Sequence, residues 1–154
     1  MAVIVRFVEG TGLDSSIIKF HTYGPWSHVE FYTPQGYIGA RLQGGVALRP
    51  FGYDSFRRQE FRQAFLNPAQ ESQLWEWVYA QIGKKYDWQT IAGMAFHRDW
   101  RQDDCWICSE MVAAAFAAIG APILRASTAD INMLTPRDIG LSTLLVPCPV
   151  PPGA

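Results

Sequence analysis

The sequence predicts an α+β domain in which a small antiparallel sheet packs against helices. Two observations favour this class. The first half of the chain is rich in β-branched and aromatic residues separated by turn signals, and the second half holds segments with helix start and stop signals. With 154 residues, 49% of them hydrophobic and 18% charged, the chain is long enough to bury a full core. We therefore expect one domain over residues 1–154.

The predicted sheet comes from five segments of the first half. These are residues 3–8, 27–33, 37–41, 46–49 and 58–65. The turn at residues 34–36, a Pro-Gln-Gly sequence, joins the second and third segments into a hairpin. Gly44 and Gly45 interrupt the chain before the fourth. An antiparallel meander is the expected arrangement.

A first helix is predicted to start after Asn67. Asn67 supplies an N-cap side chain, Pro68 suits the first helical position, and Gln70 completes a capping box. Gly83 is expected to end this helix. An apolar stripe at helical spacing should lie on the sheet, formed by Leu74, Trp77, Val78 and Ile82.

The second predicted helix is rich in alanine. Residues 111–120 have strong helix propensity and stop at Gly120, and their apolar surroundings predict the most buried helix of the domain. Thr135 begins one more short helical turn, and residues 147–151 read as a frayed tail.

Composition and charge exclude several classes of function. Thirteen Lys and Arg against fourteen Asp and Glu give a formal charge of −1, so nucleic-acid binding is not expected. The apolar run at residues 111–124 is too short for a membrane span. No signal peptide precedes the first strand, which favours a cytoplasmic protein or one that is phage-associated or exported by another route. The oligomeric state is open.

Cys108 is the strongest candidate for chemistry. It lies at the start of the alanine-rich helix, where free backbone N–H groups and the helix dipole favour a thiolate. Among three histidines, His28 is the best candidate base, because strand alternation puts it on one face with Glu30, which can orient the imidazole. Taken singly, a cysteine in an apolar helix is more often an inert core residue, and a strand histidine is more often only a satisfied polar group.

Cys105 and Cys108 form a C-x-x-C motif that invites a metal or redox interpretation. No second pair of cysteines exists, and Cys148 is isolated, so we expect no metal and no cofactor, although His28 or His97 would be available to complete a zinc site. A thioredoxin-like site would follow the first strand of a β-α-β pattern, whereas this motif follows most of the strands.

Four short motifs resemble a known family. They are residues 26–30 (WSHVE), 83–88 (GKKYDW), 106–112 (WICSEMV) and 135–139 (TPRDI). The histidine segment precedes the cysteine segment, which resembles the circularly permuted papain-like branch of the NlpC/P60 superfamily, with its YiiX-like and lecithin:retinol acyltransferase-like cysteine hydrolases. The likeness runs over about residues 14–144 and implies a permuted papain-like fold.

The resemblance implies a thiol hydrolase or acyltransferase. Cys108 would attack a carbonyl carbon, and His28 would accept and return the proton. The family's third residue sits on the strand after the histidine, where this chain has no acid, amide or histidine. Three alternatives are therefore open: Glu30 takes its place, Gln43 takes its place, or the third member is absent. The Cys108 backbone N–H and the Tyr86 hydroxyl are candidate oxyanion donors.

The sequence does not identify the substrate. Trp106, with other tryptophans near the motifs, is a candidate lining residue of an apolar groove. A peptide, a peptidoglycan peptide or a lipid acyl group would each suit a cysteine peptidase, amidase or acyltransferase. The alternative is a non-catalytic binding or structural module, associated with a phage or a cell envelope, that keeps a papain-like groove.

Overall fold

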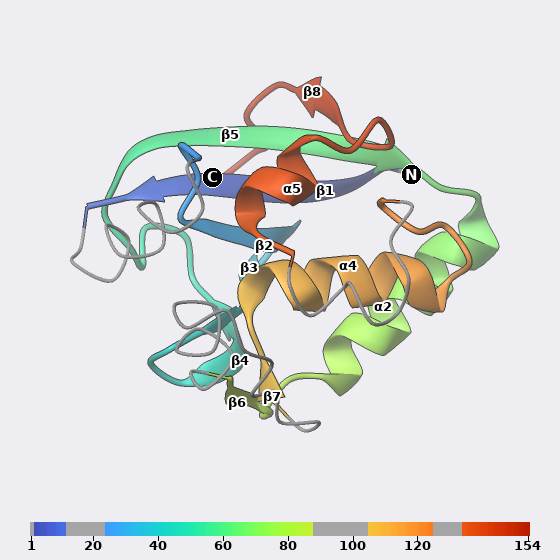
Figure 1. Cartoon of the computed structure of the whole chain (residues 1–154), viewed down its shortest axis with the longest axis horizontal. Coiled ribbons are helices and arrows are strands. Elements are labelled where there is room, and N and C mark those ends of the chain that lie inside the picture. The colour runs from blue at the N-terminus through green and yellow to red at the C-terminus, as the bar shows by residue number, and fades with distance from the viewer. Residues whose placement is uncertain (1, 12–23, 88–104, 125–133) are drawn as a thin grey trace.

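The centre of the protein is a six-stranded antiparallel sheet with the strand order β4-β3-β2-β1-β5-β8 (Figure 1). The computed structural model describes residues 2–11, 24–87, 105–124 and 134–154. The strands are β1 Ala2–Gly10, β2 His28–Thr33, β3 Gly36–Arg41, β4 Gly45–Arg49, β5 Phe56–Phe65 and β8 Val146–Cys148. The five segments predicted as strands all lie in this sheet, so the α+β class and the antiparallel pairing are confirmed. The predicted meander is wrong for the fifth segment, because β5 pairs with β1 and not with β4.

Three helices are described. They are α2 Pro68–Ala80, α4 Cys108–Ala118 and α5 Pro136–Gly140. The predicted capping box of α2 is present, because the Asn67 side chain accepts from the Gln70 N–H and the Gln70 side chain accepts from the Asn67 N–H. Thr135 caps α5 in the same manner with Asp138.

The predicted end of α2 and one member of its stripe are wrong. Leu74 and Val78 are fully buried, but Ile82 is 42% exposed. The helix ends at Ala80, because the Gln81 N–H bonds the Val78 carbonyl in a tighter turn, and Ile82 therefore leaves the helical phase before Gly83. Helix α2 instead reaches the sheet through a neighbouring aromatic ring, that of Trp75, which meets Phe31 edge-on at 5.9 Å between centroids.

The prediction of a frayed C-terminal tail is also wrong. Residues of β8 pair with β5, with Arg62 opposite Pro147 and Gln63 opposite Val146. Proline lacks the N–H that a central strand needs, but it is tolerated here because β8 is the edge of the sheet. Leu145, only 4% exposed, anchors the segment in the core.

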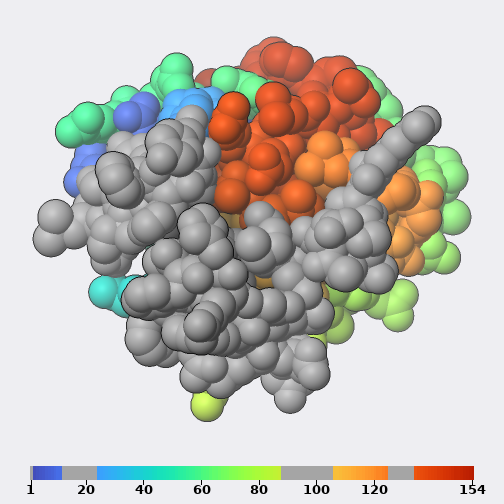
Figure 2. All heavy atoms as spheres, viewed as in Figure 1, coloured from blue at the N-terminus to red at the C-terminus, as the bar shows by residue number. Residues whose placement is uncertain are grey.

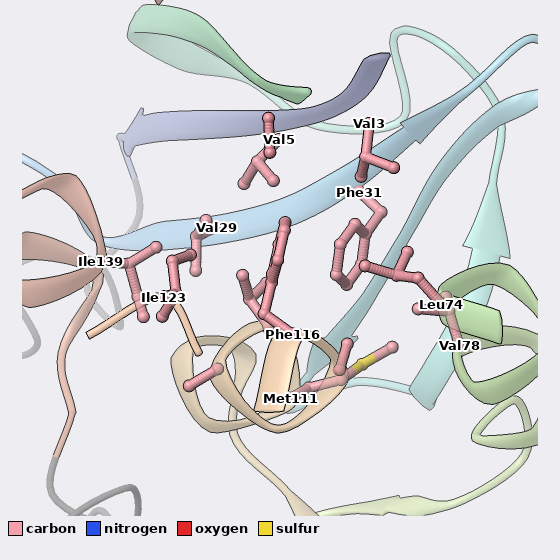
Figure 3. Close-up of a cluster of buried hydrophobic side chains, with 14 of the residues drawn as sticks. Val3, Val5, Val29, Phe31, Leu74, Val78, Met111, Phe116, Ile123 and Ile139 are labelled. Atoms are coloured by element: carbon pink, nitrogen blue, oxygen red, sulfur yellow. The ribbon is translucent and has the colours of Figure 1, made fainter. Parts of the chain in front are cut away.

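The core lies between the sheet and α4 (Figure 3). Val29 and Phe31 of β2 face Phe116 of α4, whose ring stacks on Phe31 at 6.2 Å between centroids. Leu74 of α2 and Met111 of α4 close the same cluster on the other side. Most residues of α4 are buried, as the sequence predicts for the alanine-rich helix. No described helix has the length and apolar character needed to cross a membrane.

The segment before α4 is fixed by a small parallel pair of strands, β6 Lys85–Tyr86 and β7 Cys105–Trp106. The Val46 N–H donates to the Lys84 carbonyl at 2.9 Å, which joins this pair to β4. Gly45 is required at the contact, because a Cβ there would lie 2.2 Å from the Lys84 carbonyl oxygen. Since β7 leads directly into α4, the contact with β4 helps to set where α4 begins.

Helix α5 and the C-terminal segment lie on the side of the molecule opposite to β6 and β7 (Figure 1). Their atoms cover the upper part of the face seen in Figure 2. Ile139 of α5 is fully buried, and the backbone at Gly140 comes close to the Phe7 ring of β1. This arrangement closes the core near the start of β2, where His28 lies.

Candidate active site

The two faces of β2 carry different chemistry. Val29 and Phe31 point into the apolar core, whereas His28 and Glu30 point to the other face, as the alternation of a strand requires. The register of the sheet puts Arg6 of β1 directly opposite Glu30. The polar face is covered by the segment between β4 and β5, and all three side chains are buried.

Glu30 is hydrogen-bonded on both carboxylate oxygens. Its Oε2 accepts from the Tyr53 hydroxyl at 2.7 Å and lies 2.9 Å from His28 Nε2, and its Oε1 accepts from Arg6 Nη1 at 2.7 Å. Burial opposes ionisation of Glu30, but the charge and hydrogen bond of His28, helped by two arginines, lower its pKa to about 2. Glu30 is therefore a carboxylate at neutral pH.

Cys108 is the first residue of α4, and its thiol is hydrogen-bonded to the His28 side chain and to the Val29 backbone N–H. Because Nε2 of His28 faces Glu30, Nδ1 is the ring nitrogen left for the thiol. Ile107, the N-cap of α4, provides no side-chain hydrogen bond to the first turn. The N-terminal N–H groups and helix dipole thus lie beside the sulfur.

Cys108 and His28 favour each other's charged form. Burial raises the pKa of the Cys108 thiol, but the charge and hydrogen bond of His28 outweigh it and the pKa falls below its ordinary value. Burial, with the nearby charge of Arg41, acts to lower the pKa of His28. The charges of Glu30 and Cys108 outweigh these effects, and the pKa of His28 is raised. Both pKa shifts act in the direction of a thiolate beside an imidazolium.

Gly39 explains how an acid fits on the histidine strand. A Cβ at Gly39 of β3 would lie 2.7 Å from the Cβ of Glu30, so any other residue there would push Glu30 aside. Strand β3, on which the sequence lacks a third polar residue, therefore leaves space at Gly39 for the Glu30 side chain of β2. Of the two candidates, Glu30 and Gln43, the structure places Glu30 against the imidazole; Gln43 is exposed in the turn after β3.

Sequence reasoning missed the charged cluster behind Glu30. Arg6 bonds Asp54 Oδ1 at 3.1 Å through Nη1 and Gln59 Oε1 at 2.8 Å through Nε, and Arg41 Nη2 bonds Asp54 Oδ2 at 2.6 Å. Arg6 is 1% exposed in spite of its charge. An arginine inside an otherwise apolar strand was the available signal, because such a residue is buried only with partners.

Other predicted site residues lie near the start of α4. Tyr86 is half-buried beside Trp106 in the β6–β7 pair. The Trp106 indole N–H donates to Gln81 Oε1 at 3.1 Å, and its ring meets Trp77 edge-on at 5.4 Å between centroids, so it takes part in packing. Their roles in an oxyanion hole or a groove stay predictions. His97 and the side chain of Cys105 lie outside the described residues.

The fold and the site together define an α+β protein with a buried cysteine, histidine and glutamate in hydrogen-bonded series. No family model and no curated protein matches the chain. Among solved structures it is similar to YiiX (DUF1105) of Escherichia coli O157:H7, described as a metalloprotein. The match has a TM-score of 0.71 and 16% sequence identity, and covers 97% of this chain and 96% of that chain. The fold is thus YiiX-like.

Proposed function

We propose that the protein is a cysteine-dependent hydrolase that acts by acyl transfer on an amide, ester or thioester. The observation that carries the proposal is the hydrogen-bonded series from the Cys108 thiol through His28 to Glu30. A nucleophile, a base and an orienting group in this order are what covalent acyl transfer requires. The histidine strand β2 precedes the cysteine helix α4, which supports our proposal that the domain is a permuted member of the NlpC/P60 superfamily.

In the first step the Cys108 thiolate attacks the carbonyl carbon, and the π electrons of the carbonyl move to its oxygen. The backbone N–H groups at the start of α4, where no side chain caps the helix, are placed to stabilise that oxyanion. Collapse of the intermediate expels the leaving group, which takes the proton held by the His28 imidazolium. The product is a thioester on Cys108 with a neutral His28.

In the second step His28 removes a proton from water, and the resulting hydroxide attacks the thioester carbonyl. The acid product leaves, and the sulfur recovers its electron pair as a thiolate beside the imidazolium. Glu30 does not exchange a proton in this scheme, because its pKa of about 2 keeps it ionised; it holds Nε2 of His28 and stabilises the imidazolium.

The metalloprotein YiiX raises the question of a metal in this chain. Within residues 2–11, 24–87, 105–124 and 134–154, no group of three or more His, Cys, Asp and Glu side chains is arranged to hold an ion. Both carboxylate oxygens of Glu30 are hydrogen-bonded, to Arg6, Tyr53 and His28. A metal cation at Glu30 would have to displace the Arg6 guanidinium. The described residues around Cys108 therefore do not fit a metal, and no step of the mechanism uses one.

Burial of the pair is the observation that favours a second candidate, a non-catalytic binding module. Cys108 is 4% and His28 is 7% exposed. A module of this kind would keep the thiol protonated and unreactive, whereas a hydrolase needs a thiolate that a small electrophile reaches. Reactivity of the thiol therefore separates the two candidates.

The deciding experiment is the pH dependence of Cys108 alkylation by iodoacetamide, with the modified residue located by peptide mass spectrometry. We expect a thiol pKa well below the ordinary value of about 8.5. His28→Gln should return the pKa to the ordinary range or above and slow alkylation at neutral pH by tenfold or more, on the order expected for loss of an adjacent base.

Cys148→Ser is the matched control, because burial raises the pKa of Cys148, whereas His28 lowers that of Cys108. Its removal should leave the Cys108 profile unchanged. An acylating probe should label wild type and Cys105→Ala at Cys108 but not Cys108→Ser. A thiol that alkylates slowly with an ordinary or raised pKa would reject the hydrolase in favour of the binding module.

A further inference from the structure

Arg41 stands beside the proposed nucleophile without belonging to the hydrogen-bonded series. Continuing the β2–β3 register, in which Phe31 lies opposite Ile38 and Tyr32 opposite Tyr37, puts Arg41 across from His28. Its charge acts on both His28 and Cys108. The guanidinium is therefore near the point where a bound acyl group would meet the sulfur.

The Arg41 side chain is held rigidly. Its Nη2 bonds Asp54 Oδ2 at 2.6 Å, and its guanidinium carbon lies 4.7 Å from the centre of the Tyr53 ring. Asp54 and Tyr53 are fixed in turn by Arg6 and Glu30. A cation held by such a framework loses little freedom when it binds an anion.

The hydrogen-bond donors of the Arg41 guanidinium are not all used within the described part of the chain. Its Nε is buried with no hydrogen-bond partner among the residues that the structure describes, although the side chain is 28% exposed. Burying a guanidinium N–H without an acceptor is unfavourable, and exceptions of this kind call for a ligand or a functional reason. Because Asp54 engages only one nitrogen, Arg41 still has donors for a second acceptor.

The local charge balance also favours an anion. Arg6, Arg41 and Arg49 surround Tyr53 and Glu30, and the described carboxylates in contact with them are those of Glu30 and Asp54. Within the described part of the chain, Arg49 bonds only carbonyl oxygens, those of Gly39, Ala47, Gln43 and Gly45. The Cys108–His28 pair is neutral overall in either protonation arrangement. One cation of this cluster therefore has no described carboxylate to balance it.

We propose that Arg41 recognises a carboxylate of the substrate close to the acyl carbon that Cys108 attacks, and so restricts the hydrolase to acyl compounds with a negative charge next to the scissile bond. This inference rests on the proposed function, because it takes Cys108 as the nucleophile. Planar guanidinium groups suit carboxylates better than lysine does, because they present parallel donors.

The test compares two alkylating reagents of nearly equal size, iodoacetate and iodoacetamide. In both, the Cys108 thiolate forms the new S–C bond and iodide leaves, so the reagents differ in the carboxylate alone. The measured quantity is the ratio of the Cys108 rate constants for iodoacetate and iodoacetamide, located by peptide mass spectrometry at neutral pH. Arg41→Gln should lower this ratio about tenfold, on the order expected for one cation near the reacting group.

Arg57→Gln is the matched control, since Arg57 is an exposed arginine of β5, and the ratio should stay at the wild-type value. Arg41→Lys keeps the charge but not the parallel donors, and should restore only part of the preference. An unchanged ratio in Arg41→Gln, with Cys108 still modified, overturns the role of Arg41 while the hydrolase stands. Failure of both reagents at Cys108 in wild type overturns the hydrolase itself.

Folding of the variant does not limit the test. If Arg41→Gln is unfolded, competition in the wild-type protein decides the question. N-acetylglycine should slow iodoacetamide alkylation of Cys108, and N-acetylglycinamide, which lacks the charge, should not. Equal effects of the two compounds would overturn the proposal.

Discussion

The two faces of strand β2 show how one short segment serves stability and chemistry at once. On one face Val29 and Phe31 pack against α4 without a polar atom among their side chains. On the other face His28 and Glu30 are joined to Arg6, Tyr53 and Cys108 by hydrogen bonds. Both faces are buried, so the difference lies in what they contact and not in their access to water.

Burial has opposite energetic consequences on the two faces of β2. Removing apolar area from water stabilises the first face in proportion to the area buried. On the second face burial is unfavourable to each charge, and only complete pairing makes it tolerable. We expect the apolar face to respond to loss of volume and the polar face to loss of a partner.

The largest effect is expected on the apolar face. Phe116→Ala removes the ring that stacks on Phe31 and leaves a cavity in the centre of the core. The free energy of unfolding should fall by about 3–5 kcal/mol, measured by urea denaturation. Phe65→Ala is the control, because this ring is 69% exposed and its loss should cost less than about 0.5 kcal/mol. Similar losses in the two variants would contradict the position of the core.

The polar face should respond nearly as strongly when one partner is removed. Arg6→Met leaves the Glu30 carboxylate buried without its guanidinium, and the free energy of unfolding should fall by about 3 kcal/mol. Adding Glu30→Leu should restore part of that loss, since the uncompensated charge disappears. If the double variant is as unstable as the sum of the two single variants, the pair does not act as a unit.

Acid should weaken the polar face in a defined range. The pKa of Glu30 is about 2 in the folded protein, below its ordinary value of 4.5, so its stabilising effect is complete above about pH 4.5. This effect is lost as the pH falls towards 2, by on the order of 3 kcal/mol. Glu30→Gln should flatten this part of the stability curve, whereas Glu76→Gln, at an exposed position of α2, should not. If the stability curve of Glu30→Gln were the same as that of wild type, a group other than Glu30 would cause the acid sensitivity.

The smallest of these effects is expected at Gly39. Gly39→Ala adds a methyl group 2.7 Å from the Cβ of Glu30 and should destabilise the protein by about 1–3 kcal/mol. Because Glu30 must move, the thiol pKa of Cys108 should rise as well. Gly140→Ala is the control, because Gly140, like Gly39, has no positive φ and its added methyl group would lie 3.7 Å from the nearest atom, an ordinary contact. A thiol pKa in Gly39→Ala that stays at the lowered wild-type value would separate Glu30 from the reactivity of Cys108.

Much of the fold could be predicted because its signals are local. The capping box at Asn67, the turn at residues 34–36 and the alanine-rich helix each depend on neighbouring residues, and the structure has all three. The pairing of β8 with β5 could not be predicted, because an edge strand that contains Pro147 depends on a distant partner.

The candidate site likewise has one part that local sequence signals predict and another that depends on distant partners. His28 and Glu30 share a face through strand alternation alone, and the start of α4 at Cys108 follows from the helix pattern. The cluster of Arg6, Tyr53 and Asp54 could not be predicted, because it joins β1 to the segment between β4 and β5 and depends on sheet register. The space that Gly39 leaves for Glu30 became visible only through the pairing of β2 with β3.

The proposed hydrolase depends on Cys108 and His28 existing as a thiolate and an imidazolium. The most direct measurement is the ultraviolet absorbance of the thiolate during a pH titration, taken as the difference between wild type and Cys108→Ser. The account predicts that thiolate absorbance is already present near neutral pH, at about pH 7, and disappears on acidification. Absorbance that appears only above about pH 8.5, as for an isolated cysteine, would contradict it.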